Sequence, residues 1–329
     1  MAVYTEISRS ELEQFLTGYA IGTLVSFKGI AEGVENSNFL LVTTTGKYIL
    51  TLYEKRVQAE DLPFYLGLMK HLAEKHIPCP VPILTKTGDM LQQLNERPAA
   101  IVSFLEGRST KYVKNHHMEA LGTSMAQMHL AAKDFPLRSS NKFSLPRWLA
   151  MGEMMAPRAD EVKQGLQEEI IEHMSFLKAH WPTSLPQGVI HADLFPDNVF
   201  YQESTISGII DFYFACNDFL AYDLAICLNA WCFENHVELN VTKAKLLITA
   251  YSRVRPLSQE ELDALPVLAS GAAMRFLLTR LHDWLYRVEG AMVTPKDPLE
   301  YLKKLRFHHG IPGPEAYGIY KEAIRDITA

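Results

Sequence analysis

The sequence predicts an α+β protein of two lobes, with a small β-rich N-terminal lobe and a larger helical C-terminal lobe. Three observations indicate this plan. The first hundred residues alternate short apolar runs with turns, helical periodicity dominates after Gly107, and one β-like island at residues 188–214 interrupts the helices. We expect residues 1–102 to form the first lobe and residues 103–329 the second, joined at the connection 103–107.

In the N-terminal lobe, apolar runs and their flanking turn residues predict the elements. Residues 39–42 and 48–53 are rich in strand-forming side chains, and the Thr-Thr-Thr-Gly-Lys segment between them predicts a hairpin turn. A helix is expected over residues 62–75, because the prolines at positions 78, 80 and 82 cannot continue it. Residues 98–105 predict a further buried strand.

In the C-terminal lobe, the spacing of apolar residues predicts a series of helices. The island between them has the pattern strand, loop, strand, turn, strand. The expected helices cover residues 116–133, 159–180, 219–233, 241–254, 259–288 and 314–326.

Composition excludes several classes of protein. With 48% hydrophobic and 21% charged residues, the 329-residue chain can build a real core. The net charge of −6 argues against a general nucleic-acid binder. The most apolar run, residues 224–233, is half the roughly 20 residues of a membrane-spanning helix. The four cysteines form no CxxC pair, and the start of the chain has no signal-peptide pattern. We expect a cytoplasmic protein without a membrane or nucleic-acid partner.

The island contains the residues most typical of chemistry. His191 and Asp193 stand two apart, Asn198 follows five residues after Asp193, and Asp211 ends the next strand. The hairpin between Asn198 and Asp211 is expected to bring them side by side with Asp193 close by. Two oxygen ligands beside a further carboxylate suit a Mg²⁺–phosphate site, in which the carboxylate orients a hydroxyl and accepts its proton. Each residue taken alone has an ordinary explanation as a turn residue or a cap, and a transition-metal site lacks a third His or Cys.

This set resembles the catalytic loop and metal-binding Asp of the aminoglycoside phosphotransferase/choline kinase-like superfamily, which has the protein-kinase-like fold. The resemblance implies that Asp193 is the catalytic base and that Asn198 and Asp211 hold Mg²⁺. Protein kinases usually carry Arg between the His and the Asp of this loop, and Ala192 stands there in this chain. The difference suits a small-molecule kinase without a phosphorylated activation loop.

Further stretches are similar to the bacterial homoserine kinases of this superfamily, and the match covers nearly the whole chain. They are residues 30–40, 48–54, 211–216, 222–225 and 275–284. The resemblance implies ATP-dependent phosphorylation of the side-chain hydroxyl of L-homoserine to O-phospho-L-homoserine, a step of threonine biosynthesis. The alternative is a kinase of the same fold for another alcohol, such as choline, methylthioribose or an aminoglycoside. A binding module without activity would be expected to lose Asp193, Asn198 or Asp211, and the sequence retains them.

Nucleotide contacts are expected from two segments. A hairpin at residues 33–38 could cover the phosphates through backbone N–H groups, although Gly and Asn also suit an ordinary turn. The segment 103–105 would be the hinge whose backbone binds adenine, or simply a buried strand end. Where the kinase-like pattern has a Lys on the third strand, this chain has Thr51, so Lys55, Arg56, or Mg²⁺ with backbone must meet the phosphate charge. The candidate residues are Gly33, Asn36, Ser37, Asn38, Ser103, Phe104 and Leu105.

The substrate is expected to bind along the late helix. An amino acid needs an Arg for its carboxylate and an acid for its amine. Arg275, Arg280 and Asp283 flank an apolar stripe there, although ion pairs on a solvated face would explain them equally well. Tyr213 and Asp218 are further candidates. His191 and Asp223 are expected to support the catalytic loop, with simple helix capping as the alternative for Asp223. Either a monomer or a homodimer is compatible with the sequence.

Overall fold

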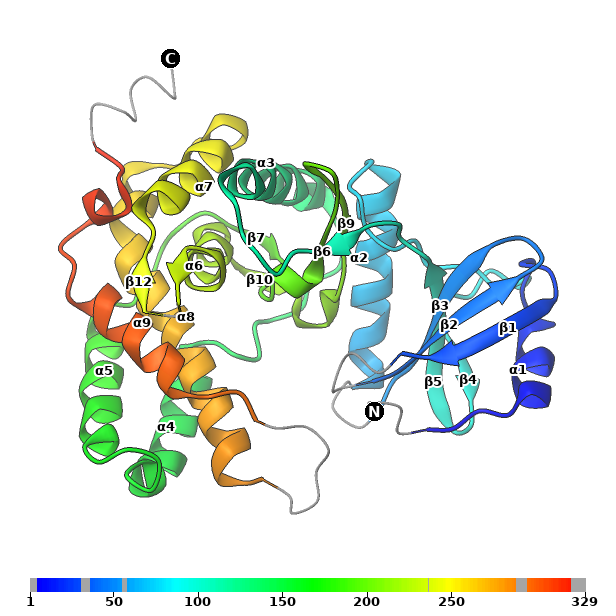
Figure 1. Cartoon of the computed structure of the whole chain (residues 1–329), viewed down its shortest axis with the longest axis horizontal. Coiled ribbons are helices and arrows are strands. Elements are labelled where there is room, and N and C mark those ends of the chain that lie inside the picture. The colour runs from blue at the N-terminus through cyan, green and yellow to red at the C-terminus, as the bar shows by residue number, and fades with distance from the viewer. Residues whose placement is uncertain (1–4, 31–35, 55–57, 236, 288–294, 321–329) are drawn as a thin grey trace.

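The computed structural model describes residues 5–30, 36–54, 58–235, 237–287 and 295–320. The chain forms two bodies side by side, a sheet with its helices and a larger helical body (Figure 1). This is the α+β, two-lobe arrangement that the sequence predicts.

The N-terminal lobe is built on a five-stranded antiparallel sheet in the order β1-β2-β3-β5-β4. The predicted hairpin is confirmed, because β2 pairs with β3 from Ser37 opposite Leu52 to Val42 opposite Lys47. The strands are β1 (Leu24–Gly29), β2 (Ser37–Thr43), β3 (Lys47–Leu52), β4 (Gln92–Leu94) and β5 (Arg97–Ser103).

The alternation of side chains along β3 gives the two faces of the sheet different roles. Leu50 and Leu52 are fully buried in a core shared with α1 (Arg9–Leu16). Ile49 and Thr51 point to the other face, where they line a cleft. Successive strand residues face opposite sides of a sheet, so one strand both builds the core and presents groups to the cleft.

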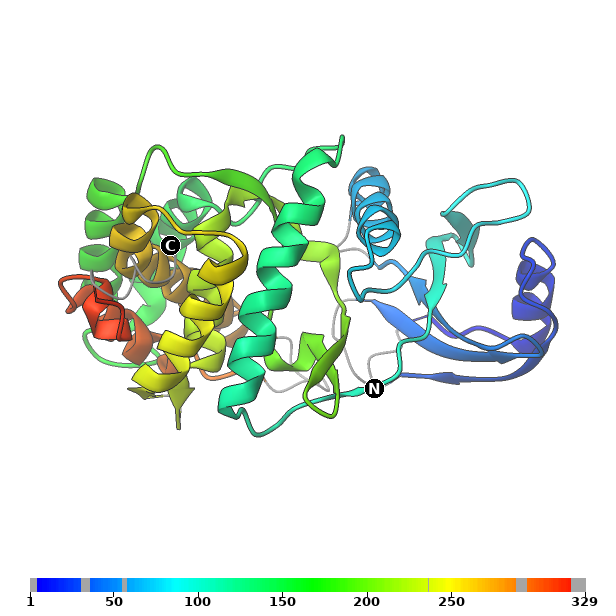
Figure 2. The same ribbon diagram turned by 90° about the horizontal axis from the view of Figure 1, so that it is seen from above.

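Helix α2 (Leu62–Glu74) lies between the sheet and the helical lobe in both views (Figures 1 and 2). Its extent confirms the predicted helix over residues 62–75. Its buried face, which includes Leu66, Met69 and Leu72, belongs to the same hydrophobic cluster as side chains of the helical lobe. The helix therefore ties the two lobes together through apolar contacts.

The helical lobe packs α3 against α7, and packs α8 against α4, α6 and α9. Three small sheets complete the lobe: β6-β8-β9, β7-β10 and β11-β12. The helices are α3 (Asn115–Ala131), α4 (Leu145–Ala159), α5 (Leu166–His180), α6 (Leu220–Trp231), α7 (Val241–Val254), α8 (Gln259–Leu285) and α9 (Leu299–His309). The strands are β6 (Arg108–Ser109), β7 (Gln187–Ile190), β8 (Val199–Gln202), β9 (Thr205–Ile209), β10 (Cys216–Phe219), β11 (Phe233–Glu234) and β12 (Glu238–Leu239).

Some predicted elements were wrong. The helix expected over residues 159–180 begins later, at Leu166 after Gly165 with φ of 82°, and is α5. Helices α1, α4 and α9 and strands β1, β4, β6, β11 and β12 were missed. The helix expected over residues 314–326 is a single 3-10 turn at Pro314–Tyr317, and residues 321–329 lie outside the described part.

Helix α8 runs through the middle of the helical lobe. Among the described residues it is the one helix long and apolar enough to cross a membrane, judged by length and composition. However, 72% of its most apolar window is buried inside the protein. A helix buried in a protein core can have the length and composition of a membrane span, so these two properties alone are weak evidence that α8 crosses a membrane.

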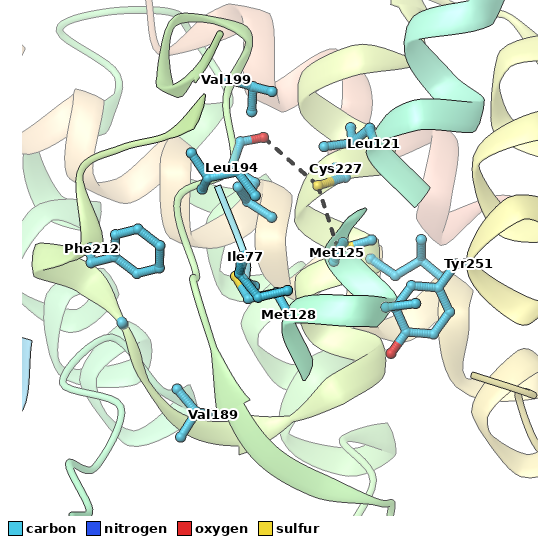
Figure 3. Packing of buried hydrophobic residues seen from close by; sticks show 14 of the residues in the cluster. Ile77, Leu121, Met125, Met128, Val189, Leu194, Val199, Phe212, Cys227 and Tyr251 are labelled. Carbon is cyan, nitrogen blue, oxygen red and sulfur yellow. Dashed lines mark hydrogen bonds between the residues drawn. The ribbon is translucent and has the colours of Figure 1, made fainter. Parts of the chain in front are cut away.

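The core of the helical lobe reaches the segments around β7 and β8. Figure 3 shows Leu121, Met125 and Met128 of α3 facing Leu194 and Cys227. The Cys227 thiol donates to the Leu194 carbonyl at 3.7 Å. The loop after β7 therefore rests on a packed apolar base.

Candidate active site

A cleft of about 600 Å³ lies between the sheet and the helical lobe. It brings together most of the residues that the sequence singled out. From the N-terminal lobe and hinge these are Asn36, Asn38, Ser103, Phe104 and Leu105, and from the helical lobe they are Asp193, Asn198, Asp211, Tyr213 and Arg280.

The hairpin β8–β9 places Asn198 beside Asp211. Asn198 ends a 3-10 turn, Pro196–Asn198, directly before β8, and Asp211 follows β9 by one residue. Val199 is paired with Ile209, and the Ile210 N–H donates to the Asn198 carbonyl at 3.0 Å. The antiparallel register therefore delivers both side chains to the same end of the cleft.

The orientation of the Asn198 amide is determined by its neighbours. Its Nδ2 donates to the Asp193 carbonyl at 2.8 Å and to the Asp193 Oδ2 at 3.1 Å. Because both partners are acceptors, the nitrogen must face Asp193, and Oδ1 must face away from it. An amide oxygen and a nearby carboxylate are the hard donors that Mg²⁺ prefers, so Asn198 and Asp211 fit a Mg²⁺ site.

Two residues of the site have left-handed backbones although they are not glycine. Ala192 has φ of 61° and Asp211 has φ of 66°. Such conformations are uncommon for residues with a Cβ atom and persist only where the surroundings hold them. For Ala192, the contacts that hold the loop 191–194 supply this support.

Polar side chains of the helical lobe bond the backbone of this loop. The buried Asp223 carboxylate accepts the N–H groups of His191 at 2.9 Å and Ala192 at 2.8 Å. On the other side, Arg275 Nη1 donates to the Ala192 carbonyl at 2.8 Å. Trp231 Nε1 donates to the carbonyl of Leu194 at 2.6 Å. The loop is therefore fixed through its main chain, which leaves the Asp193 side chain at the cleft.

The protonation state of His191 follows from its two hydrogen bonds. Nδ1 accepts the Asp193 N–H at 3.2 Å, so the proton of the neutral ring is on Nε2, which donates to the Ile210 carbonyl at 2.9 Å. Burial lowers the pKa of His191 and keeps the ring neutral. His191 thus links the catalytic loop to the strand end before Asp211.

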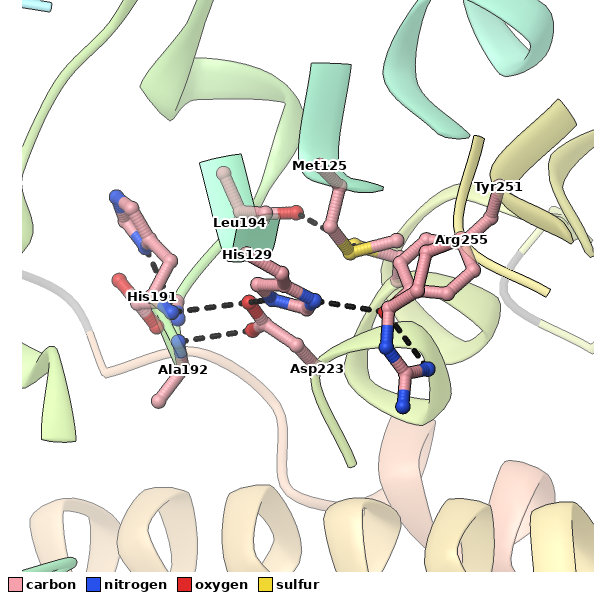
Figure 4. Close-up of polar contacts among 10 residues, drawn as sticks. Met125, His129, His191, Ala192, Leu194, Asp223, Tyr251 and Arg255 are labelled. Carbon is pink, nitrogen blue, oxygen red and sulfur yellow. Dashed lines mark hydrogen bonds and ion pairs between the residues drawn. The ribbon is translucent and has the colours of Figure 1, made fainter. Parts of the chain in front are cut away.

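Asp223 is the inner end of a longer buried chain of polar groups (Figure 4). His129 Nε2 lies 3.0 Å from Asp223 Oδ2, and His129 Nδ1 lies 2.8 Å from the Tyr251 hydroxyl. Burial alone would raise the pKa of Asp223, but the hydrogen bonds from His129 and the loop outweigh it and lower that pKa. The support expected from His191 and Asp223 is thus present as geometry, with His129 and Tyr251 as members that the sequence did not indicate.

Of the nucleotide-binding candidates at the start of β2, some lie at the cleft and one lies in the core. Asn36 and Asn38 line the cleft, whereas Ser37 is fully buried and its hydroxyl donates to Glu54 at 2.8 Å. The side chains of a strand alternate, so Ser37 faces the opposite side of the sheet. Gly33 lies outside the described residues.

Thr51, which occupies the position where the resemblance led us to expect a Lys, lines the cleft. Its hydroxyl donates to Asn38 Oδ1 at 2.8 Å. A neutral hydrogen-bonded pair therefore occupies this wall. Lys55 and Arg56, the alternatives considered for this charge, lie outside the described residues.

At the hinge, Ser103 already forms hydrogen bonds with the neighbouring segment. Its N–H donates to the Val81 carbonyl and its hydroxyl accepts the Val81 N–H, both at 2.9 Å. The Ser103 main-chain donor cannot therefore serve adenine. Phe104 and Leu105, which also line the cleft, are the better hinge candidates.

Of the substrate candidates on α8, Arg275 is buried rather than presented to the cleft. Its guanidinium lies 4.8–5.5 Å from the ring centroids of Phe143, Phe214 and Phe276, and it holds the Ala192 carbonyl. The side chain is only 3% exposed and is not among the groups that line the cleft. The expectation that Arg275 binds substrate is corrected to a role in supporting the loop.

Arg280 lines the cleft, but Asp283 does not. Arg280 Nη1 forms an ion pair with Glu300 Oε2 at 2.6 Å and donates to the Asp297 carbonyl at 3.0 Å. Asp283 is half exposed and lies 3.5 Å from His282. The solvated-face alternative therefore describes Asp283.

Tyr213 and Asp218 differ in whether they line the cleft. Tyr213 lines the cleft and its hydroxyl lies 3.2 Å from that of Tyr53, and burial raises its pKa to about 12. Asp218 accepts from Asn141 Nδ2 at 2.6 Å, and burial raises the pKa of its carboxyl. It does not line the cleft, so substrate contact is not expected of it.

Sequence reasoning missed part of the cleft wall on the side of the helical lobe. Phe276 follows Arg275 by one residue and precedes Arg280 by one helical turn, which is a spacing the helix pattern contained. Lys296 precedes α9 in an irregular segment, where no periodicity could reveal it. The missed lining residues with polar or aromatic side chains are Ser109, Phe195, Asp197, Phe200, Phe212, Phe214, Phe276 and Lys296.

Comparisons with known proteins agree with this geometry. Residues 26–257 match the model of the phosphotransferase enzyme family. The homoserine kinase of Rhodospirillum rubrum is 58% identical over 97% of this chain and 99% of its own length. The homoserine kinase of Rhizobium meliloti is 55% identical over 98% of this chain and 99% of its own length.

Solved structures share the fold at low sequence identity. The amicoumacin kinase in complex with AMP-PNP, Ca²⁺ and its ligand has a TM-score of 0.68 at 16% identity, covering 95% of this chain and 94% of that one. Spectinomycin phosphotransferase in complex with ADP and spectinomycin has a TM-score of 0.69 at 15% identity, covering 95% and 98%. From its family match and its full-length relatives, this chain belongs to the phosphotransferase enzyme family and, within it, to the homoserine kinases.

Proposed function

We propose that this protein transfers the γ-phosphoryl group of ATP to the side-chain hydroxyl of L-homoserine and so forms O-phospho-L-homoserine and ADP. The observation that carries the proposal is the cleft in which Asp193, Asn198 and Asp211 converge between the two lobes. Homoserine kinases with more than half of their residues identical cover nearly the whole chain, which supports this substrate over other alcohols.

Asp193 is proposed as the general base. Its carboxylate lies at the cleft on a loop held through the main chain, and Asn198 Nδ2 donates to Oδ2. The hydroxyl oxygen of homoserine bonds to the γ-phosphorus as the bond to the β–γ bridging oxygen breaks, and the hydroxyl proton passes to Asp193. Because the barrier is mainly one of positioning, the rigidity of the loop is part of the catalysis.

Asn198 and Asp211 are proposed to hold Mg²⁺. A bound Mg²⁺ would neutralise developing charge on the phosphate oxygens. The amide oxygen of Asn198 faces away from Asp193, and Asp211 follows the neighbouring strand of the same hairpin, which supports their use as a pair. Asn36 and Asn38 would contact the phosphates, and the main chain at Phe104 and Leu105 would contact adenine.

We further propose a cytoplasmic enzyme that acts on small molecules as a monomer or homodimer. The cysteines Cys79, Cys216, Cys227 and Cys232 are buried and free, as expected in a reducing compartment.

The function can be tested by measuring ADP release from ATP and Mg²⁺ in the presence of L-homoserine, choline, methylthioribose or kanamycin. L-homoserine should give the highest kcat/KM, and the product should carry phosphate on the side-chain oxygen. A preference for any of the other three alcohols would contradict the proposal.

A further inference from the structure

Among the described residues, the end of the cleft formed by the helical lobe is lined by the cationic side chains of Arg280 and Lys296. They differ in their partners. Arg280 is 12% exposed, is ion-paired with Glu300 and donates to the Asp297 carbonyl at 3.0 Å. The pKa of Glu300 is lowered to about 2, because Lys304 and Arg280 outweigh the effect of burial. The charge of Arg280 is therefore already matched inside the protein.

Lys296 is exposed at the cleft and its charge is not matched in this way. Its Nζ lies 5.9 Å from the ring centroid of Phe195. Across the described ranges of the chain, no carboxylate oxygen lies within 4 Å of this Nζ. An ammonium group at a cleft that forms no ion pair with a carboxylate of the described ranges is available to a carboxylate of a ligand.

The backbone that carries Lys296 is held in place. Arg280 bonds the carbonyl of the next residue, Asp297, and Asp297 Oδ1 accepts the N–H of Leu299 at the start of α9. The Arg280 guanidinium also lies 4.5 Å from the ring centroid of Tyr301. Arg280 thus anchors the segment to α8 and α9, while the Lys296 side chain extends from it.

Phe195 connects this segment to the reacting end of the cleft. Its N–H donates to the Asp193 carbonyl at 2.8 Å, and its ring meets Phe276 at 5.0 Å. Lys296 therefore lies across a single aromatic side chain from the loop that carries the base. In L-homoserine the hydroxyl oxygen and the carboxylate carbon are separated by only three carbon atoms, so the two groups need binding partners this near to each other.

We propose that Lys296 binds the carboxylate of the amino-acid substrate and that Arg280 positions the Lys296 segment instead of binding the carboxylate itself. The inference rests on the proposed function, since it assumes that L-homoserine is the substrate. It makes Lys296 a specificity-determining residue and Arg280 a positioning residue. It also gives each of the two described cations at this end of the cleft a separate role.

The test compares L-homoserine with 3-aminopropan-1-ol, which is the same molecule without the carboxylate. The wild-type enzyme should have the higher kcat/KM for L-homoserine. Lys296→Ala should raise KM for L-homoserine about tenfold to a hundredfold, the range of a lost charge-assisted contact. The kcat/KM for 3-aminopropan-1-ol and the KM for ATP should stay within about twofold of wild type, and Lys296→Arg should restore part of the preference.

Lys303→Ala is the matched control, because Lys303 is an exposed lysine on α9 outside the cleft lining. It should behave as wild type with both alcohols. A double-mutant cycle tests Arg280: Arg280→Gln should raise KM for L-homoserine in the wild-type background but add little to Lys296→Ala. Additive effects of the two substitutions would overturn the positioning role.

The possible failures are distinguishable. If the wild-type enzyme transfers no phosphate to L-homoserine, the proposed function is wrong and the inference falls with it. If the wild-type enzyme is active and Lys296→Ala keeps its preference for L-homoserine over 3-aminopropan-1-ol, the inference alone is wrong.

Discussion

At the scale of single residues, the directions of the hydrogen bonds that His191 and Asn198 form around Asp193 can be assigned. His191 donates from Nε2 to the Ile210 carbonyl and accepts at Nδ1 from the Asp193 N–H. Asn198 donates to Asp193 and presents its oxygen elsewhere. These directions leave the Asp193 carboxylate as an acceptor, which is the state a general base requires.

Asp193→Asn should remove the base and leave the fold unchanged, because the amide has nearly the same shape as the carboxylate. We expect kcat to fall on the order of 10²–10⁴-fold with ATP binding retained. Steady-state kinetics together with nucleotide titration check this. Turnover close to wild type in the purified variant would refute the role of Asp193.

Asp211→Ala and Asn198→Ala should differ in their response to Mg²⁺. Loss of the charged ligand should abolish activity at every Mg²⁺ concentration, whereas loss of the neutral amide should be partly rescued at high Mg²⁺, because water can replace an amide oxygen more readily than a carboxylate. Rescue of Asn198→Ala should stay incomplete, since its Nδ2 also orients Asp193. A titration in which both variants recover equally would contradict these roles.

The convergence of the three proposed reacting residues was predictable because they are local in the sequence. Asp193, Asn198 and Asp211 belong to one loop and one hairpin, so their spacing alone indicates that they meet. The substrate side was not predictable in this way. Lys296 reaches the cleft from an irregular segment, and the choice between Arg275 and Arg280 depended on tertiary packing that helical periodicity does not contain.

At the scale of elements, helices α3, α6 and α7 are joined through a chain of hydrogen bonds. Arg255 Nη1 donates to the Tyr251 hydroxyl oxygen at 3.3 Å, and that hydroxyl lies 2.8 Å from His129 Nδ1. His129 Nε2 in turn lies 3.0 Å from Asp223, the residue that holds the loop (Figure 4). The position of the loop therefore depends on helices that do not touch the cleft.

Tyr251→Phe should loosen this chain, because His129 Nδ1 loses its hydrogen-bond partner in a buried position. We expect a loss of about 1–3 kcal/mol in the free energy of unfolding, together with a fall in kcat at unchanged KM for both substrates. Urea denaturation and kinetics measure the two effects. Tyr317→Phe is the matched control, since its hydroxyl lies 2.8 Å from His308 in another buried pair. It should lower stability and leave kcat unchanged, and an equal fall in kcat for both variants would contradict the role of Tyr251.

Element boundaries were predictable where apolar periodicity was strong and poorly predictable where proline or short length intervened. The bounds of α7 and the β2–β3 hairpin follow the apolar pattern. Pro157 is more typical of a helix start, yet it lies in the last turn of α4, where it supplies no N–H group to the helix. In contrast, α1 carried a readable signal, the capping box of Ser8 and Glu11, that was not used.

At the scale of the whole molecule, we propose that the boundary between the lobes lies at Ser103, where β5 ends and the chain leaves the sheet. The α2 cluster continues across this boundary into the helical lobe. Both lobes contribute to one cleft, so a ligand that fills it contacts both and should stabilise their arrangement.

The stability of the whole chain should also depend on pH in a defined window, because several buried histidines are held neutral. Burial lowers the pKa of His173 and His191, and it lowers that of His308 to about 3. A histidine whose folded-state pKa is depressed binds fewer protons than in the unfolded chain. Its contribution is fully present above its unfolded pKa of about 6.5 and is lost as pH falls from there toward the folded value.

The free energy of unfolding should therefore decrease between pH 6.5 and pH 5, above the range in which Glu300 begins to titrate in the unfolded chain. Each histidine that takes up a proton on unfolding adds a slope of up to about 1.4 kcal/mol per pH unit. Urea denaturation at closely spaced pH values measures the slope. His308→Phe should reduce the number of protons taken up on unfolding by about one, and the slope should fall accordingly. Leu305→Ala removes a fully buried side chain of the same helix without a titratable group, so it should lower the curve at every pH and leave the slope intact. A wild-type curve that is flat across this window would mean that these histidines do not govern the acid stability of the fold.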